Sequence, residues 1–368
     1  MTEAIEARAV VAEGAHRSRI DGLDYLRLIA ALAVVAFHWI YYGPWVGIIP
    51  LRTSFVLGAS YGVLGVELFF IISGFVIATS IHGRDAGGFL ASRATRLYPA
   101  YWAGLIVSVG VLALTNGLGI HGVKQILANV TMFAPLLGYE NLEGVYWTLQ
   151  MELLFYIMVA VFVLAGKRSW LDLFFPIWAI GMLVSTILLP LVSELPLLGY
   201  LNLFFAGGAV IAGGARSGWT PLRIAGLAAA VIGGAIAAVR HGLKGPLVPW
   251  EPAIVVAVVV GMFGVVLLLT VPRIARARLP GSRVAGAITY PLYLVHCAIG
   301  YALIAAVATP ETAWWVTGAC LVVVLGVSYL IHRLVEQLPA GIWRTVFGVC
   351  IARPVRRLQT VLTGGADR

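Results

Sequence analysis

The stretch 23-LDYLRLIAALAVVAFHWIYY-42 is almost entirely apolar, yet it contains Arg27 and His38. About 20 apolar residues are enough for an α-helix to cross a bilayer, so the stretch predicts a membrane-spanning helix. The two polar residues are eleven positions apart, which places them on one helical face, roughly 16 Å apart along the axis. Because polar groups on one face of such a helix are costly in lipid, this face is expected to line a protein interior.

The composition of the whole chain supports a membrane protein. Its 368 residues are 61% hydrophobic and 11% charged, whereas a soluble domain has about 25% charged residues. The sequence predicts an all-α, polytopic membrane bundle of about ten transmembrane helices. The predicted helices span residues 23–42, 61–81, 97–115, 147–166, 170–191, 197–214, 221–239, 252–271, 284–307 and 312–332.

The distribution of basic residues predicts the orientation of the bundle. With the N-terminus in the cytoplasm, the outer side receives only four of the 25 lysines and arginines, namely Arg52, Lys124, Arg240 and Lys244. This asymmetry follows the positive-inside rule and predicts that both termini are cytoplasmic. The net charge of +9 is therefore interpreted as a topology signal, and no nucleic-acid partner is expected.

The predicted topology divides the chain into three parts: a cytoplasmic N-terminal tail at 1–18, a membrane domain at 19–339 and a basic cytoplasmic tail at 340–368. The first 20 residues lack an apolar core, so no cleaved signal peptide is expected. Cys297, Cys320 and Cys350 lie in or beside apolar runs without metal-ligand spacing, and the histidines lack such spacing on any one helix. No metal site is expected.

The topology also places polar residues at two depths in the membrane. His38, Glu67, Glu152 and His296 are expected near one level in the outer half, while the arginines lie toward the cytoplasm. Arg93 and Arg96, spaced i, i+3, share a helical face. Each residue also has a purely structural interpretation, as a snorkelling arginine, a helix-packing glutamate or a buried, hydrogen-bonded histidine. The residues alone leave both interpretations open.

Six stretches in one order resemble the acyltransferase-3 family of integral membrane acyltransferases, of the carbohydrate O-acyltransferase type. The resemblance covers roughly residues 19 to 339 and lies in RIDGLDYLRLIAALAVVAFH, GVLGVELFFIISGFVIATS, FLASRATRLYPAYW, YWTLQMELLFY, ITYPLYLVH and SYLIHRLVEQLP. It implies a ten-helix bundle that moves an acyl group, often acetyl, from cytosolic acyl-CoA to a carbohydrate hydroxyl. The chain departs from the family pattern at Gln150 and Thr289, where many relatives have a small residue and a serine.

By the same resemblance, Arg27, His38, the pair Arg93 and Arg96, and Glu152 match residues of the family's motifs. We expect the three arginines to hold the phosphates of CoA, because a guanidinium is a permanently charged fork of donors. The extended arm of CoA measures roughly 15–20 Å, close to the axial separation of Arg27 and His38.

His38 is the candidate general base, which would take the proton of the acceptor hydroxyl. Glu152 is the second candidate catalytic residue, and it would either orient the imidazole or bind acceptor hydroxyls. The expected substrate-binding residues are Glu67, Trp147, Tyr156 and His296.

The expected donor is acyl-CoA, with acetyl-CoA first, and no metal cofactor is expected. The expected acceptor is a carbohydrate or glycolipid of the cell envelope, reached from the bacterial plasma membrane. Two alternatives remain: acylation of a macrolide-type sugar, and a transporter or flippase, since intramembrane carboxylates and histidines also build substrate paths. The transporter is disfavoured because the sequence lacks a repeat and its arginines gather at one cytosolic mouth.

Overall fold

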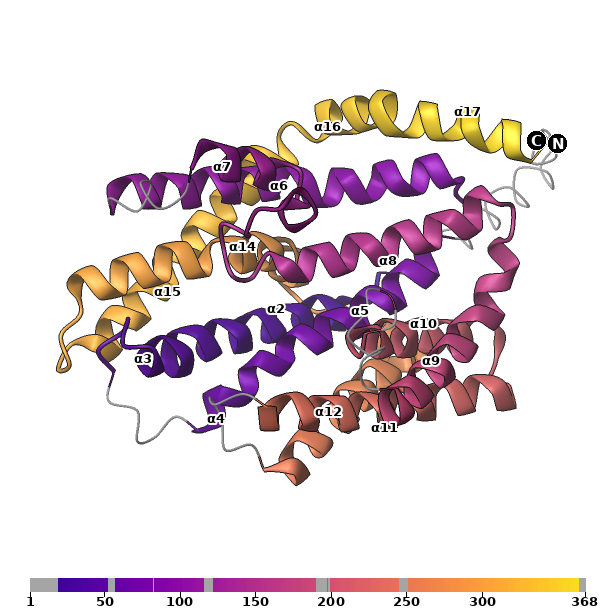
Figure 1. Ribbon diagram of the computed structural model, residues 1–368, viewed down its shortest axis with the longest axis horizontal. Coiled ribbons are helices and arrows are strands. Elements are labelled where there is room, and N and C mark those ends of the chain that lie inside the picture. Colours follow the sequence, from indigo (N-terminus) through magenta and orange to yellow (C-terminus); the bar gives the residue numbers. More distant parts are fainter. Residues whose placement is uncertain are drawn as a thin grey trace.

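The computed structural model describes residues 19–51, 57–81, 83–115, 122–189, 197, 199–244 and 251–363. Within these ranges the chain is helical and contains no strand, which confirms the all-α prediction (Figure 1). The predicted N-terminal tail at 1–18 lies outside the described residues. The helices are α2 (Asp21–Ala36), α3 (Gly43–Trp45), α4 (Leu57–Ser60), α5 (Gly65–Ser80), α6 (Ala86–Leu114), α7 (Val123–Val130), α8 (Trp147–Leu164), α9 (Leu171–Leu188), α10 (Leu201–Ser217), α11 (Pro221–Lys244), α12 (Pro252–Leu268), α13 (Pro272–Ala275), α14 (Ser282–Val307), α15 (Ala313–Ile331), α16 (Ala340–Phe347) and α17 (Arg353–Leu362).

Eight helical spans in the described ranges are long and apolar enough to cross a membrane. They correspond to eight of the ten predicted spans, while the sixth and eighth correspond to α10 and α12, which have 17 residues each. The third span begins at Ala86, eleven residues before the predicted start. The prediction placed Arg93 and Arg96 at the approach to this helix, and the structure places both inside it.

The contact between α5 and α10 is the most extensive one between two helices in the described part of the chain. Every residue of α10 from Leu201 to Gly214 is buried, and close approach of the two backbones requires glycine at the crossing. A Cβ atom at Gly74 would overlap the carbonyl of Phe205, and one at Gly208 would overlap the carbonyl of Ile71. Small residues at such crossings are typical of membrane helix packing.

The helix that carries His38 packs against α14 along its length. α2 passes into a π-helical turn, Phe37–Tyr42, which includes His38, and such turns often mark functional sites. Trp39 of this turn is buried and donates its indole N–H to the carbonyl of His296, at 3.0 Å. Gly300 leaves the space that the indole occupies. The π-helical turn is therefore fixed to one turn of α14.

The C-terminal segment is helical and packs on the arginine-bearing helix. α16 and α17 lie alongside α6 (Figure 1). Gln359 of α17 accepts a hydrogen bond from the N–H of Ala86, at 3.1 Å. Asp85 caps α6 by accepting from the N–H of Gly88, at 2.6 Å, and it pairs with Arg356. Burial raises the pKa of Asp85, but these two hydrogen bonds outweigh it and leave the pKa below its ordinary value.

The α5–α10 crossing gives a first prediction. Gly208→Val should lower the thermal unfolding temperature in detergent, since overpacking a tight crossing costs about 1–3 kcal/mol. Gly261→Val on α12 is the matched control, because a Cβ at Gly261 meets nothing within 4 Å. Equal unfolding temperatures for the two variants would contradict the packing.

Candidate functional site

A cavity of about 670 Å³ lies between α2, α5, α6, α8 and α14. Most of its polar side chains come from α2, α6, α8 and α14. It is also lined by His332 and Gln337, from the π-helical segment that follows α15. Both positive and negative groups face it, with arginine predominating. The charged residues in its lining are Arg19, Asp24, Arg27, Arg93, Arg96, Glu152 and Arg283.

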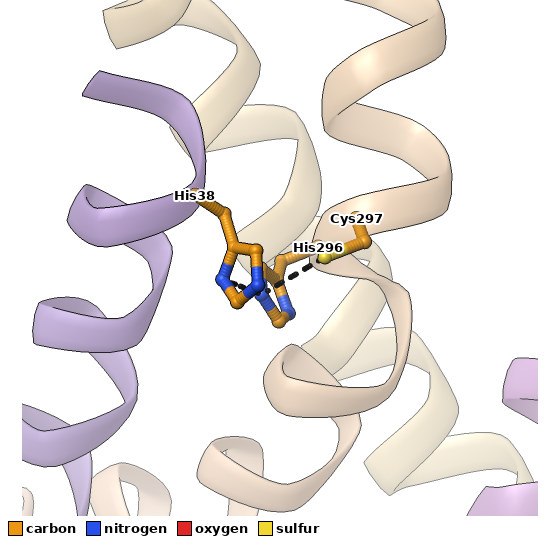
Figure 2. Close-up of side chains that lie close together, drawn as sticks. All are labelled: His38, His296 and Cys297. Atoms are coloured by element: carbon orange, nitrogen blue, oxygen red, sulfur yellow. Dashed lines mark hydrogen bonds between the residues drawn. The ribbon is translucent and has the colours of Figure 1, made fainter. Parts of the chain in front are cut away.

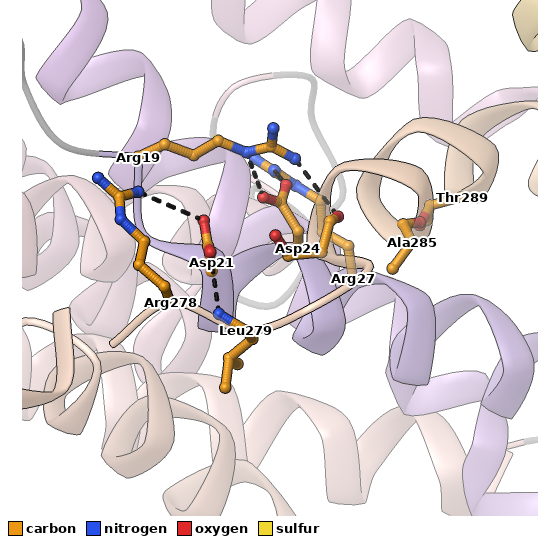
Figure 3. A network of polar contacts seen from close by, with 9 residues as sticks. Arg19, Asp21, Asp24, Arg27, Arg278, Leu279, Ala285 and Thr289 are labelled. Carbon is orange, nitrogen blue, oxygen red and sulfur yellow. Dashed lines mark hydrogen bonds and ion pairs between the residues drawn. The ribbon is translucent and has the colours of Figure 1, made fainter. Parts of the chain in front are cut away.

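Asp24 anchors one arginine of α2 and one arginine that precedes this helix. Its carboxylate pairs with Arg19 at 2.6 Å and with Arg27 at 3.2 Å (Figure 3). The side chain of Asp24 is only 8% exposed. Gly286 of α14 makes room for this carboxylate, because a Cβ there would overlap it. Asp24 and Asp21 also place negative charge in the first turn of α2, where it interacts favourably with the positive end of the helix dipole and stabilises the helix.

Arg93 and Arg96 both reach the cavity from α6, but their surroundings differ. Arg96 pairs with Glu336 at 3.3 Å and lies 5.7 Å from the ring centroid of Tyr290. Arg93 lies between the rings of Phe89 and Tyr156, at 5.8 and 5.9 Å. Its buried Nε atom has no hydrogen-bond partner among the described residues. A buried donor without a partner is uncommon in proteins, and a water, an ion or a ligand can satisfy it.

Glu152 faces the same cavity from α8. Its Oε1 atom accepts hydrogen bonds from Ser73, at 2.8 Å, and from Tyr156, one helical turn further along. These bonds come from α5 and α8 and hold the carboxylate toward the cavity. Tyr156, an expected substrate-binding residue, lines the cavity as well.

His38 lies next to His296, not beside Glu152. Nδ1 of His38 is 3.2 Å from Nε2 of His296, and Sγ of Cys297 is 3.3 Å from the same Nε2 (Figure 2). His296 is fully buried, while His38 is partly exposed. The lining described for the cavity includes neither histidine, but it includes Tyr293, whose carbonyl accepts from His296.

Glu67 and Trp147 are placed apart from the cavity lining. Glu67 is buried in the first turn of α5, next to Val66, which does line the cavity. Its Oε2 atom has no hydrogen-bond partner in the part of the chain that the structure describes. Trp147 begins α8 and is 38% exposed. Of the expected substrate-binding residues, only Tyr156 therefore lines the cavity.

Some residues of the site were missed in the sequence. Asp24 stands three positions before Arg27, and this i, i+3 spacing of opposite charges was a usable signal. Ser73 carried none, because its partner Glu152 comes from another helix. Cys297 was interpreted as a packing residue, although its neighbour His296 is its contact. Outside the cavity lining, Glu143 in the loop before α8 accepts a hydrogen bond from Ser108, and burial raises the pKa of Glu143 to about 7.

The fold and the cavity define a multi-pass membrane protein with an arginine-lined interior. The chain matches the acyltransferase-3 model, which describes an acyltransferase domain, over residues 20–333. It belongs to this family of membrane acyltransferases, as its sequence motifs predicted.

Two curated relatives are similar to parts of the chain. Nodulation protein 10 of Rhizobium leguminosarum bv. viciae is 29% identical over 171 residues, which cover 40% of this chain and 45% of the relative. The exopolysaccharide production protein ExoZ of Rhizobium meliloti (strain 1021) is 33% identical over 122 residues, which cover 30% of this chain and 36% of the relative. The matched regions thus span less than half of each relative. No solved structure matches the chain.

The Asp24 cluster gives a second prediction. Asp24→Asn should destabilise the protein by about 3–5 kcal/mol, because it leaves Arg27 partly buried without its carboxylate. Asp172→Asn is the control, since Asp172 is 42% exposed where it pairs with Arg216 and such pairs contribute up to about 1 kcal/mol. Thermal unfolding in detergent compares the two variants. A loss for Asp24→Asn no larger than the control's would contradict the anchoring role.

Proposed function

We propose that the protein transfers an acyl group from cytosolic acyl-CoA to a hydroxyl of a carbohydrate or glycolipid at the bacterial plasma membrane. The observation that carries the donor assignment is the arginine-lined cavity, in which the Nε atom of Arg93 has no hydrogen-bond partner among the described residues. Its volume of about 670 Å³ lies within the range of small-molecule sites. Arg27, Arg93 and Arg96 offer the bidentate donors that bind phosphates well.

The donor enters from the cytosolic side, because the positive-inside distribution assigns these arginines to that side. The nucleotide end lies at Arg27, Arg93 and Arg96. The thioester end points toward Tyr293, one helical turn from His296. Glu152, held by Ser73 and Tyr156, contacts the bound substrate, and its bonds support this role over that of orienting His38.

The acceptor approaches His38 from the outer half of the bundle. Two observations support this approach: His38 is partly exposed, and aromatic rings surround it, with those of Tyr42 and Tyr301 at 6.2 and 6.5 Å. Aromatic faces of this kind stack on sugar rings. The Oε2 atom of Glu67, which has no partner within the described ranges, is suited to accept a hydrogen bond from an acceptor hydroxyl. The similarity to an exopolysaccharide production protein supports a polysaccharide acceptor.

In the reaction, His38 takes the proton of the acceptor hydroxyl as the oxygen attacks the thioester carbonyl. A carbon–oxygen bond forms and the carbon–sulfur bond breaks. The proton then passes from His38 to the departing sulfur, which leaves as the thiol of CoA. The chain's residues therefore supply positioning and proton transfer, and acetyl-CoA is the first donor to test.

The donor site gives a third prediction. Arg93→Gln should raise the KM for acyl-CoA about tenfold or more, since hydrogen bonds to charged groups contribute about 1.5–3 kcal/mol. Arg223→Gln on α11 is the control, because Arg223 donates to the carbonyl of Gly218 away from the cavity. Initial rates at varied acyl-CoA measure the effect. An unchanged donor KM would contradict the assignment.

Acyl-CoA should also raise the unfolding temperature of the wild-type protein, because a ligand that binds the folded state stabilises it. A flippase for the acceptor would show no such stabilisation. If the enzyme instead acylates a macrolide-type sugar, acyl-CoA still raises the unfolding temperature. In that case the envelope glycans of a deletion strain keep their acyl groups, which their mass shows.

The acceptor site gives a fourth prediction. Glu67→Gln should raise the KM for the acceptor and leave the KM for acyl-CoA unchanged, because the variant replaces one of the two carboxyl oxygens with an NH₂ group, which only donates. Glu251→Gln, at the exposed start of α12, is the control. If Glu67→Gln changed only the KM for acyl-CoA, Glu67 would not bind the acceptor, and the prediction would be wrong.

A further inference from the structure

His296 is buried behind His38 and has no exposed surface, whereas His38 is partly exposed. A substrate can therefore reach the first imidazole but not the second. Any contribution of His296 to the reaction must pass through the ring of His38, whose centroid is 5.0 Å away.

The hydrogen bonds of His296 determine which of its nitrogens carries a proton. Nδ1 lies 2.8 Å from the carbonyl oxygen of Tyr293. A carbonyl oxygen only accepts, so Nδ1 is the donor, and a neutral imidazole has only one N–H. Nε2 of His296 is therefore an acceptor, directed at His38 (Figure 2).

The bonds of His38 lead to the same tautomer. Its Nδ1 lies 2.9 Å from the carbonyl of Val34 and 3.2 Å from Nε2 of His296. Both partners are acceptors, so Nδ1 carries the hydrogen. The lone pair of His38 is left on Nε2, which is the nitrogen available to a substrate hydroxyl.

We propose that His296 is the positioning residue of the acyl transfer, whose Nε2 accepts from Nδ1–H of His38 and so keeps Nε2 of His38 free as the base. This inference rests on the proposed function, since it takes His38 as the base. After Nε2 of His38 has taken the hydroxyl proton, its Nδ1–H still donates to His296 and Val34. The proton on Nε2 then goes to the departing thiolate, which restores the neutral tautomer.

The surrounding contacts support a positioning role. The carbonyl of His296 holds the indole of Trp39, and the hydroxyl of Tyr301 donates to the carbonyl of His38 at 3.4 Å. The segment of α14 from His296 to Tyr301 thus holds the backbone of the π-helical turn and the ring of His38. A group that orients a catalytic histidine through its second nitrogen is a recurring device in enzymes.

The same three side chains raise a second possibility. Ligand atoms of His38, His296 and Cys297 all lie within 4.8 Å of one another, a separation that suits a metal ion. The carbonyl of Val34 argues for a hydrogen on Nδ1 of His38, which bars that nitrogen from ligating. A metal bound to Nε2 of His296 would also occupy the lone pair that accepts from Nδ1–H of His38, so a metal-dependent activity would overturn the proposal.

The test compares variants of His296 in the full-length protein. His296→Leu removes the acceptor and should lower kcat about tenfold or more while both KM values are unchanged, because general base catalysis contributes about 10²–10⁴-fold. His296→Gln keeps an acceptor oxygen near the position of Nε2 and should recover part of this loss. Cys320→Ala on α15 is the control for a buried substitution and should keep the wild-type kcat.

A direct readout is the ¹⁵N NMR spectrum of histidine-labelled wild-type protein, which should show His38 as the Nδ1–H tautomer. This measurement stands even if His296→Leu fails to fold. The inference is overturned if His38 is the Nε2–H tautomer, if His296→Leu keeps the wild-type kcat, if His296→Gln is no better than His296→Leu, or if chelation abolishes activity. His38→Ala separates the proposal that His38 is the base from the proposal that His296 positions it. If His38→Ala retains transfer, His38 is not the base.

Discussion

The α2–α14 contact is the constraint on which the whole site depends. At one end, the missing side chain of Gly286 admits the carboxylate of Asp24, which holds Arg27 at the cavity. At the other end, His296 meets His38 through its ring and Trp39 through its carbonyl. Two rigid helices thus set both the position of the phosphate-binding arginine and that of the proposed base. A shift of either helix would move the two groups together.

Of the residues with a proposed role, some have their polar atoms satisfied by neighbouring side chains and two do not. Asp24 and Glu152 are held by neighbouring side chains and so serve as fixed parts of the cavity. Arg93 and Glu67 each keep a buried atom without a partner among the described residues. Since leaving such an atom unpaired costs about 1–3 kcal/mol, these two positions are the ones that a bound donor and a bound acceptor would stabilise.

The sequence was sufficient to predict the helical class, the family and most of the spans, because apolar runs and motif order are local properties. It also placed His38 and His296 at one level, since depth follows from topology. It could not predict that His296 rather than Glu152 would contact His38, because the rotation of each helix about its axis depends on packing. The early start of α6 was missed for a related reason: Arg93 and Arg96 were expected at the approach to the helix, but they face a polar cavity from within it.

The central claim is that the arginine-lined cavity holds the nucleotide end of acyl-CoA and directs its acyl end to His38. A cryo-electron microscopy structure with an acyl-CoA analogue, in which a thioether replaces the thioester, tests this claim most directly. The account predicts phosphate density within hydrogen-bond distance of Arg27, Arg93 or Arg96, and the acyl end beside Nε2 of His38. Phosphates bound outside the cavity, or an acyl end that does not reach His38, would contradict it.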